Sequence, residues 1–100
     1  MERKLLTADD MAAAMGALTG WTVDGKVLKR RFEFENFAAA LAFVNRVGTI
    51  AESLDHHPDI TFGWGYAEVA TTTHDRGGLT EFDLELARQT ASIPKSEPPA

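Results

Sequence analysis

The sequence predicts an α+β fold, an α-β-β-α-β-β-α sandwich in which a four-stranded antiparallel sheet carries three helices on one face. Apolar residues recur at spacings of three and four in three segments, which is the period of an amphipathic helix. Between these segments lie two pairs of shorter apolar runs, and a glycine-containing turn separates the members of each pair. Antiparallel hairpins joined through a helix are typical of an α+β domain.

The first and last helices each begin with the same short motif. Thr7 and Asp10, and again Thr80 and Asp83, have the spacing of a capping box, in which two side chains satisfy the free N–H groups of a helix start. The first helix is therefore expected from about residue 8, and the last from about residue 81 into the nineties. Gly20 is expected to end the first helix, because glycine readily adopts the left-handed conformation that closes many helices.

The longest helix is expected to follow Asn36, a frequent N-cap residue, and to stop before Pro58, which cannot continue a helix. Its core face is expected to be the apolar stripe Phe37, Leu41, Val44, Val47, Ala51 and Leu54. Strands are expected at 21–23, 26–34, 60–64 and 66–73.

Length and composition indicate one domain over residues 1–93 and a frayed tail over 94–100 that takes no part in chemistry. The net charge of −5 repels nucleic-acid phosphates and anionic membrane surfaces. The absence of cysteine excludes disulfides and thiolate metal clusters, which favours a reducing, cytoplasmic setting. We find no signal-peptide pattern and expect no membrane-spanning segment.

The three histidines fall within a short part of the chain. His56 and His57 are adjacent at the predicted end of the longest helix, and His74 follows a predicted strand. An imidazole, with an ordinary pKa of about 6.5, gives and takes protons near neutral pH. Glu52 lies four residues before His56, on the same helix face, where it can orient the imidazole or accept an N–H of a substrate. The alternative for any one of these residues is a structural role.

A larger set of residues resembles the pterin-4a-carbinolamine dehydratase family: Glu52-Ser-Leu-Asp-His56-His57-Pro58, Trp64, Thr73-His74-Asp75, Gly78-Leu79-Thr80 and Asp83, with Gly20-Trp21 and Phe32 to Phe37 upstream. The resemblance implies a small α+β fold whose protomers form dimers or dimers of dimers by extending their sheets and packing helices. It also implies a hydro-lyase without a cofactor, which converts 4a-hydroxytetrahydrobiopterin or a related pterin to quinonoid dihydropterin. Such an enzyme recycles tetrahydrobiopterin for aromatic amino acid hydroxylases and is coupled to them in function.

The resemblance also assigns roles to single residues. It implies that His56, His57 and His74 are catalytic, and that the pterin is bound by Glu52, Asp55, Pro58, Trp64, Thr72, Thr73 and Asp75. Trp64 is interpreted either as a wall of the pterin pocket or, more readily, as a sheet residue packed under a helix. Ile60 stands where the family often has an aromatic residue, and the loop reads Asp75-Arg-Gly-Gly, so the preferred pterin stays open.

Loss of water from a hemiaminal needs proton transfer on two sides. As a hypothesis, His56 or His74 protonates the 4a-hydroxyl group, another histidine accepts the N5 proton, and His57 mainly positions the ring. The sequence leaves open which histidine is the acid and which the base. This mechanism requires the three imidazoles to converge on one hollow sized for a bicyclic heterocycle.

Two other functions are compatible with the same residues. Three histidines near carboxylates could bind zinc, but adjacent histidines diverge and lack the four-residue spacing of a helical zinc pair, so we expect no metal. Some members of the resembled family also serve as dimerisation cofactors of a homeodomain transcription factor through their helical face. A protein-binding module without catalytic turnover is therefore the alternative to the enzyme.

Overall fold

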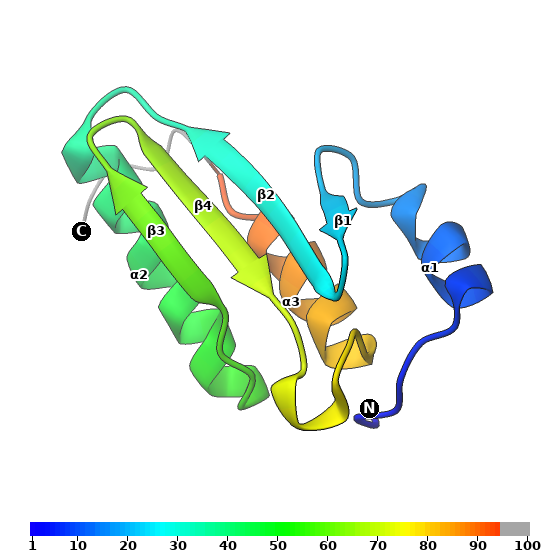
Figure 1. Ribbon diagram of the computed structural model, residues 1–100. Coiled ribbons are helices and arrows are strands. Elements are labelled where there is room, and N and C mark those ends of the chain that lie inside the picture. Colours follow the sequence, from blue (N-terminus) through cyan, green and yellow to red (C-terminus); the bar gives the residue numbers. More distant parts are fainter. Residues whose placement is uncertain (95–100) are drawn as a thin grey trace.

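The computed structural model describes residues 1–94, so most of the tail predicted over 94–100 lies outside the described residues. The predicted order of helices and strands is confirmed (Figure 1). The elements are α1 (Ala8–Met15), β1 (Thr22–Asp24), β2 (Val27–Glu33), α2 (Phe37–Leu54), β3 (Asp59–Gly63), β4 (Tyr66–Thr71), the short 3-10 helix η1 (His74–Arg76) and α3 (Glu81–Ala91).

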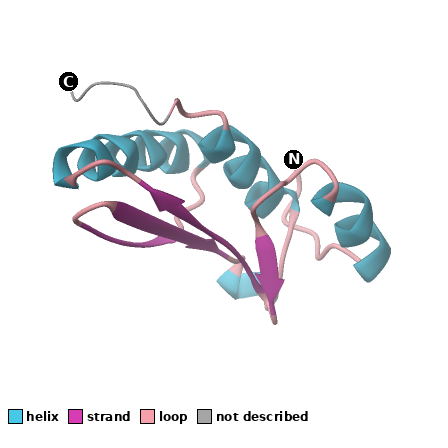
Figure 2. Ribbon diagram, turned by 90° about the horizontal axis from the view of Figure 1, so that it is seen from above, coloured by secondary structure: helices cyan, strands magenta, loops and turns pink. Residues whose placement is uncertain are grey.

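The four strands form one antiparallel sheet in the order β1-β2-β4-β3. Helices α2 and α3 lie together on one side of this sheet, and α1 lies beyond β1 at the margin of the same layer (Figure 2). The predicted α+β sandwich is therefore confirmed. Among residues 1–94, no helix covers the other face of the sheet, as is common for antiparallel sheets (Figure 2).

The core lies between the sheet and α2. Leu28 and Val69 on the inner face of the sheet and Val47 on α2 are each fully buried. Phe32 of β2 packs against Phe43 of α2 with ring centroids 4.6 Å apart. Burial of each such side chain stabilises the fold by about 1.5–3 kcal/mol, so this contact holds α2 firmly on the sheet.

The prediction that Gly20 ends the first helix is wrong. Helix α1 stops at Met15, and Gly20 lies in a separate turn, where it does have a positive φ of 89°. Leu18 and Trp21 are only 3% and 4% exposed, so the chain leaves the helix early and turns these two side chains into the core. A Cβ at Gly20 would come within 2.9 Å of the Arg30 side chain, which also favours glycine there.

The predicted core stripe of the longest helix is only partly right. Val47 and Ala51 are buried as expected, but Phe37 and Leu41 are 44% and 40% exposed. The buried face of α2 is Ala40, Phe43, Val47 and Ala51. By length and mean hydropathy, α2 is also the one helix among residues 1–94 that could cross a membrane, although no such segment was expected. The buried face of this helix covers the sheet.

Candidate functional site

The turn after α2 separates the two adjacent histidines. Asp55 caps the helix in the left-handed conformation, with φ 50° and ψ 45°, which Asp tolerates better than most residues. Its N–H bonds back to the carbonyl groups of Ala51 and Glu52. The chain then points the His56 side chain inward, where it is 7% exposed, while the His57 side chain is 55% exposed.

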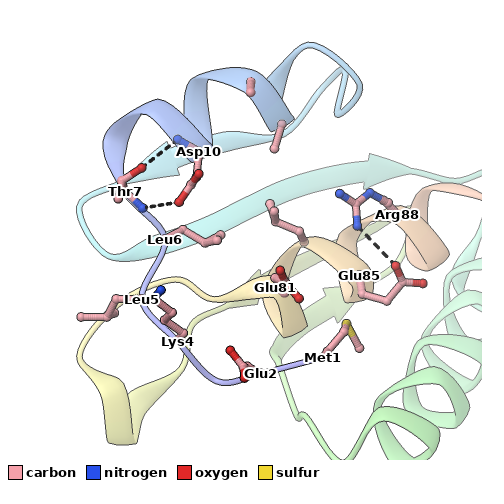
Figure 3. A pocket seen from close by; sticks show the side chains of 13 residues that line it. Met1, Glu2, Lys4, Leu5, Leu6, Thr7, Asp10, Glu81, Glu85 and Arg88 are labelled. Atoms are coloured by element: carbon pink, nitrogen blue, oxygen red, sulfur yellow. Dashed lines mark hydrogen bonds and ion pairs between the residues drawn. The ribbon is translucent and has the colours of Figure 1, made fainter.

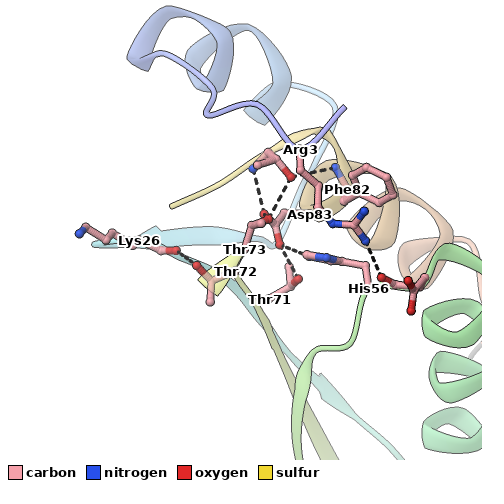
Figure 4. A network of polar contacts seen from close by, with 10 residues as sticks. Arg3, Lys26, His56, Thr71, Thr72, Thr73, Phe82 and Asp83 are labelled. Carbon is pink, nitrogen blue, oxygen red and sulfur yellow. Dashed lines mark hydrogen bonds and ion pairs between the residues drawn. The ribbon is translucent and has the colours of Figure 1, made fainter. Parts of the chain in front are cut away.

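The His56 side chain belongs to a buried network of polar contacts centred on Asp83 (Figure 4). Its Nε2 lies 2.7 Å from Oδ1 of Asp83, which is fully buried at the start of α3. The same oxygen accepts a hydrogen bond from the Thr71 hydroxyl group at 2.6 Å. The second oxygen, Oδ2, accepts from the Thr73 hydroxyl at 2.8 Å and from the Thr80 N–H at 2.9 Å. The carboxylate thus receives four donors, which is how a buried charge is kept in a protein.

The direction of each hydrogen bond in this network follows from the carboxylate. Because Thr73 gives its hydroxyl proton to Asp83, its oxygen accepts from the Thr80 hydroxyl 2.9 Å away. The Thr80 oxygen in turn accepts from the Phe82 N–H. Since Asp83 Oδ1 is an acceptor, the Nε2 of His56 carries a proton, and Nδ1 is the nitrogen left for chemistry.

The N-terminal segment closes over this network. The Arg3 guanidinium donates to the carbonyl oxygen of Asp55 at 2.6 Å and lies 4.0 Å from the centroid of the Phe82 ring (Figure 4). Phe82 is also next to the His56 imidazole, with ring centroids 5.8 Å apart. Arg3 therefore bridges the turn that presents the histidines to the first turn of α3.

Glu52 contacts a different histidine from the one that its spacing predicted. Its Oε2 lies 2.5 Å from Nε2 of His57, not of His56. The helical spacing fails because α2 ends at Leu54 and the left-handed Asp55 breaks the periodicity before His56 is reached. The Glu52 and His57 side chains are 78% and 55% exposed, so solvent screens this pair.

His74 follows the network directly in sequence. It is exposed and opens η1, one residue after Thr73, whose hydroxyl reaches Asp83. Thr73 also pairs with Gly78, and Gly77 closes the turn with a φ of 72°. Within residues 1–94 no hydrogen bond or ion pair of the His74 imidazole is found, which leaves both ring nitrogens available. Asp83 thus ties His56 to the strand end that carries His74.

The predicted pterin-binding residues divide between the two ends of the sheet. Pro58 and Thr72 are half-buried and Asp75 is exposed, all at the end where α2 and η1 meet (Figure 1). Trp64 lies in the opposite turn, between β3 and β4, and is 72% exposed. The expectation that it packs under a helix is wrong. The five residues of β3 lie between it and Pro58 in extended conformation, which places the two roughly 20 Å apart, so Trp64 walls no pocket at the histidine end of its own chain.

The hollows that the structure shows at residues 1–94 include two that lie away from the histidines. An open groove of about 790 Å³ lies between the N-terminal segment, α1 and α3, with Leu5, Leu6 and Leu84 among its apolar lining (Figure 3). A smaller hollow of about 290 Å³ lies where α2 and α3 meet. Neither includes a histidine, so the convergence of all three rings on one hollow stays a prediction. Among residues 1–94, no three His, Asp or Glu side chains are grouped as metal ligands.

Comparison with known proteins decides the family. The family profile described as "Pterin 4 alpha carbinolamine dehydratase" matches residues 4–93. The chain belongs to this pterin-4a-carbinolamine dehydratase family. A relative from Rubrobacter xylanophilus is 49% identical over 83 residues, which are 82% of this chain and 78% of the relative. One from Thermomicrobium roseum is 43% identical over 83% of this chain and 89% of its own length. Both carry the name "Putative pterin-4-alpha-carbinolamine dehydratase".

A solved structure agrees with the fold of this dehydratase-family chain. The structure from Brucella melitensis described as a "transcriptional coactivator/pterin dehydratase" superposes with a TM-score of 0.84 at 36% identity. The match covers 89% of this chain and 97% of the other. The α+β architecture is therefore that of the pterin dehydratase family.

Sequence reasoning missed the central residue of the polar network in this family member. Asp83 was interpreted as the second half of a capping box, and its Oδ2 does accept the Thr80 N–H in that manner. A signal was nevertheless present. Asp83 lies on the same helical face as Ala87 and Thr90, which are both fully buried. A carboxylate on the apolar face of a helix requires partners, and here one of them is a histidine 27 residues away.

Proposed function

We propose that this protein is a hydro-lyase that dehydrates 4a-hydroxytetrahydrobiopterin or a related 4a-hydroxytetrahydropterin to the quinonoid dihydropterin. Membership of the pterin-4a-carbinolamine dehydratase family supports the reaction class. The observation that carries the proposal is the buried His56–Asp83 pair. A carboxylate held by four donors keeps one imidazole in a single orientation and stabilises the positive charge that the ring acquires when it takes a proton.

The proposed chemistry uses two histidines on two sides of the substrate. His56 accepts the N5 proton of the pterin, and the electron pair of that N–H bond forms the C4a=N5 double bond. The C4a–O bond breaks as His74 gives a proton to the leaving hydroxyl group, and water departs. Positioned general acids and bases of this kind accelerate such reactions roughly 10²- to 10⁴-fold. Asp83 supports the assignment of His56 as the base because it favours the protonated ring.

The exposed groups around the turn suit recognition of a polar heterocycle. The His57–Glu52 pair and the carboxylates of Asp55 and Asp75 are solvent-accessible at this end of the sheet. Carboxylate oxygens accept the N–H groups that a pterin ring presents, and the backbone beside Thr72 and Thr73 offers further partners. His57 then positions the ring rather than transferring a proton.

The test is a stopped-flow measurement of dehydration, with the carbinolamine generated by an aromatic amino acid hydroxylase. The protein is expected to abolish the lag that spontaneous dehydration imposes. His74→Ala is expected to lower the rate about 10²- to 10⁴-fold, because one of the two proton transfers is lost. The fold of this variant is expected to persist, because the His74 side chain is exposed and its removal eliminates no buried contact. A parent protein without effect on the lag would refute the function, and a His74→Ala variant at the parental rate would refute the role of His74.

The proposal also includes self-association into dimers or tetramers in the cytoplasm, where the enzyme would recycle tetrahydrobiopterin for a hydroxylase. Exposed Phe37 and Leu41 on α2 support it, because apolar side chains that are 44% and 40% exposed are suited to an interface. The same helix face is where a protein-binding role would reside. The stopped-flow assay distinguishes the two functions, since a binding module leaves the lag unchanged.

A further inference from the structure

The two carboxylate oxygens of Asp83 accept hydrogen bonds from different donors. Oδ2 accepts from the hydroxyl group of Thr73, which is the N-cap residue of η1, and from the N–H of Thr80, which is the N-cap residue of α3. Oδ1 is shared between Nε2 of His56 and the hydroxyl group of Thr71, at 2.7 and 2.6 Å. Thr71 is therefore the only one of these donors that competes with the histidine for the same atom.

We propose that Thr71 is a positioning residue that limits how tightly Asp83 holds a protonated His56, so that the ring releases its proton in each turnover. A hydroxyl donor on a carboxylate oxygen withdraws part of the negative charge that the imidazolium would otherwise meet. Without that donor the His56–Asp83 pair holds its proton more strongly, and an acid–base group must let the proton go. The consequence for turnover rests on the proposed function, whereas the effect on the pair does not.

Packing alone does not require a hydroxyl group at position 71. Thr71 is fully buried at the end of β4, and its inner-face neighbours along that strand are Val69 and Ala67. A valine has nearly the same shape and would continue this apolar surface. The hydrogen bond of Thr71 to Asp83 is thus the feature that distinguishes threonine from valine at this position.

The remaining ionisable groups near the pair stay constant when Thr71 is changed. They come from the N-terminal segment, the end of α2 and its cap, the start of β3, η1 and the first turn of α3, and they include Arg3, Glu52, Asp55, His57, Asp59, His74, Asp75 and Glu81. Within residues 1–94, the Thr71 hydroxyl donates to Asp83 and forms no hydrogen bond with any of these groups. A change in the titration of His56 after removal of this hydroxyl therefore reports on Asp83 Oδ1.

The experiment follows the His56 ring by NMR during a pH titration of the full-length protein. Thr71→Val and Thr71→Ala, which both lack the hydroxyl, are expected to raise the titration midpoint of His56 by about half a pH unit or more. Thr71→Ser is expected to restore the parental midpoint. Thr90→Val is the matched control, because Thr90 is also fully buried and its Oγ1 has no hydrogen-bond partner among the described residues.

The pH dependence of dehydration provides the second readout. In the hydroxyl-free variants kcat is expected to fall at neutral pH and to recover toward higher pH, while KM changes little. The serine variant and Thr90→Val are expected to keep the parental profile. Equal His56 midpoints in the parent, Thr71→Val and Thr71→Ala would overturn the proposal, whether or not the protein is a dehydratase. A shifted midpoint in a protein that does not dehydrate the pterin would instead refute only the proposed function.

Discussion

The two capping boxes of this chain share one motif and differ in what surrounds it. Thr7 and Asp10 begin α1, and Thr80 and Asp83 begin α3, with the same reciprocal pair of hydrogen bonds. Asp10 is exposed, and its carboxylate accepts a hydrogen bond from the Thr7 N–H, whereas Asp83 is fully buried and also binds His56, Thr71 and Thr73. The motif therefore specifies a helix start in both places, and burial against β4 turns the second one into part of a site.

The largest effect is expected from Asp83→Asn. Asparagine has an NH₂ group in place of one carboxylate oxygen. The two donors that bonded to that oxygen would then face another donor in a fully buried position. Leaving a buried donor without its acceptor costs about 1–3 kcal/mol, and more where the lost acceptor was charged. The free energy of unfolding in urea should fall by about this amount, and the dehydration rate by about 10- to 100-fold as His56 loses its orientation.

Asp10→Asn is the matched control for this substitution, because it makes the same chemical change in the same motif. If both variants lost equal stability, burial would not be the difference between the two boxes. Retention of parental dehydration by Asp83→Asn would contradict the support that we assign to the His56–Asp83 pair.

A smaller effect is expected from Glu52→Gln. The carboxylate pairs with His57 at 2.5 Å, but both side chains are mostly exposed. Exposed pairs of this kind stabilise proteins by about 0.2–1 kcal/mol, so the urea midpoint should hardly move. The effect should appear mainly in KM, because His57 and Glu52 are proposed to hold the pterin. A loss of stability comparable to that of Asp83→Asn would show that the exposed pair has a larger structural role than its exposure indicates.

The order of helices and strands was predictable because its signals are local. Capping boxes, the Asp24-Gly25 turn and the apolar periods each act within a few residues, and they place the helices and the first hairpin correctly, although the buried face of α2 differs in part from its predicted stripe. The end of α1 was not predictable in this way. It depends on the burial of Leu18 and Trp21, which follows from contacts with distant parts of the chain.

The members of the candidate site stay a prediction from the family resemblance, and the contacts among them could not be predicted from the sequence. Family resemblance selected the histidines, but helical spacing paired Glu52 with the wrong one, because a single left-handed residue at Asp55 resets the direction of the chain. The position of Asp83 next to His56 depends on how α3 packs on the sheet, and sequence spacing carries no information on that. Exposed Trp64 likewise follows from its place in the β3–β4 turn.

The smallest expected effect concerns the exposed capping box and its dependence on pH. The pKa of Asp10 is lowered from its ordinary value of 3.8, first by the hydrogen bond from the Thr7 backbone and then by that from the Thr7 side chain. A carboxyl group whose pKa is lowered by folding stabilises the protein above the pKa of the unfolded chain. That contribution disappears as the pH falls through the lowered pKa of the folded state.

Thermal or urea unfolding of the parent and Asp10→Asn between pH 7 and pH 2 measures this contribution. The parent should be slightly more stable at pH 7, with a difference that is constant down to about pH 4 and closes below it. The difference should be small because the group is exposed and Asn still accepts one hydrogen bond at a helix start. A difference that instead grew toward low pH would contradict the direction of the pKa change. Such a result would mean that the two boxes differ in more than their burial.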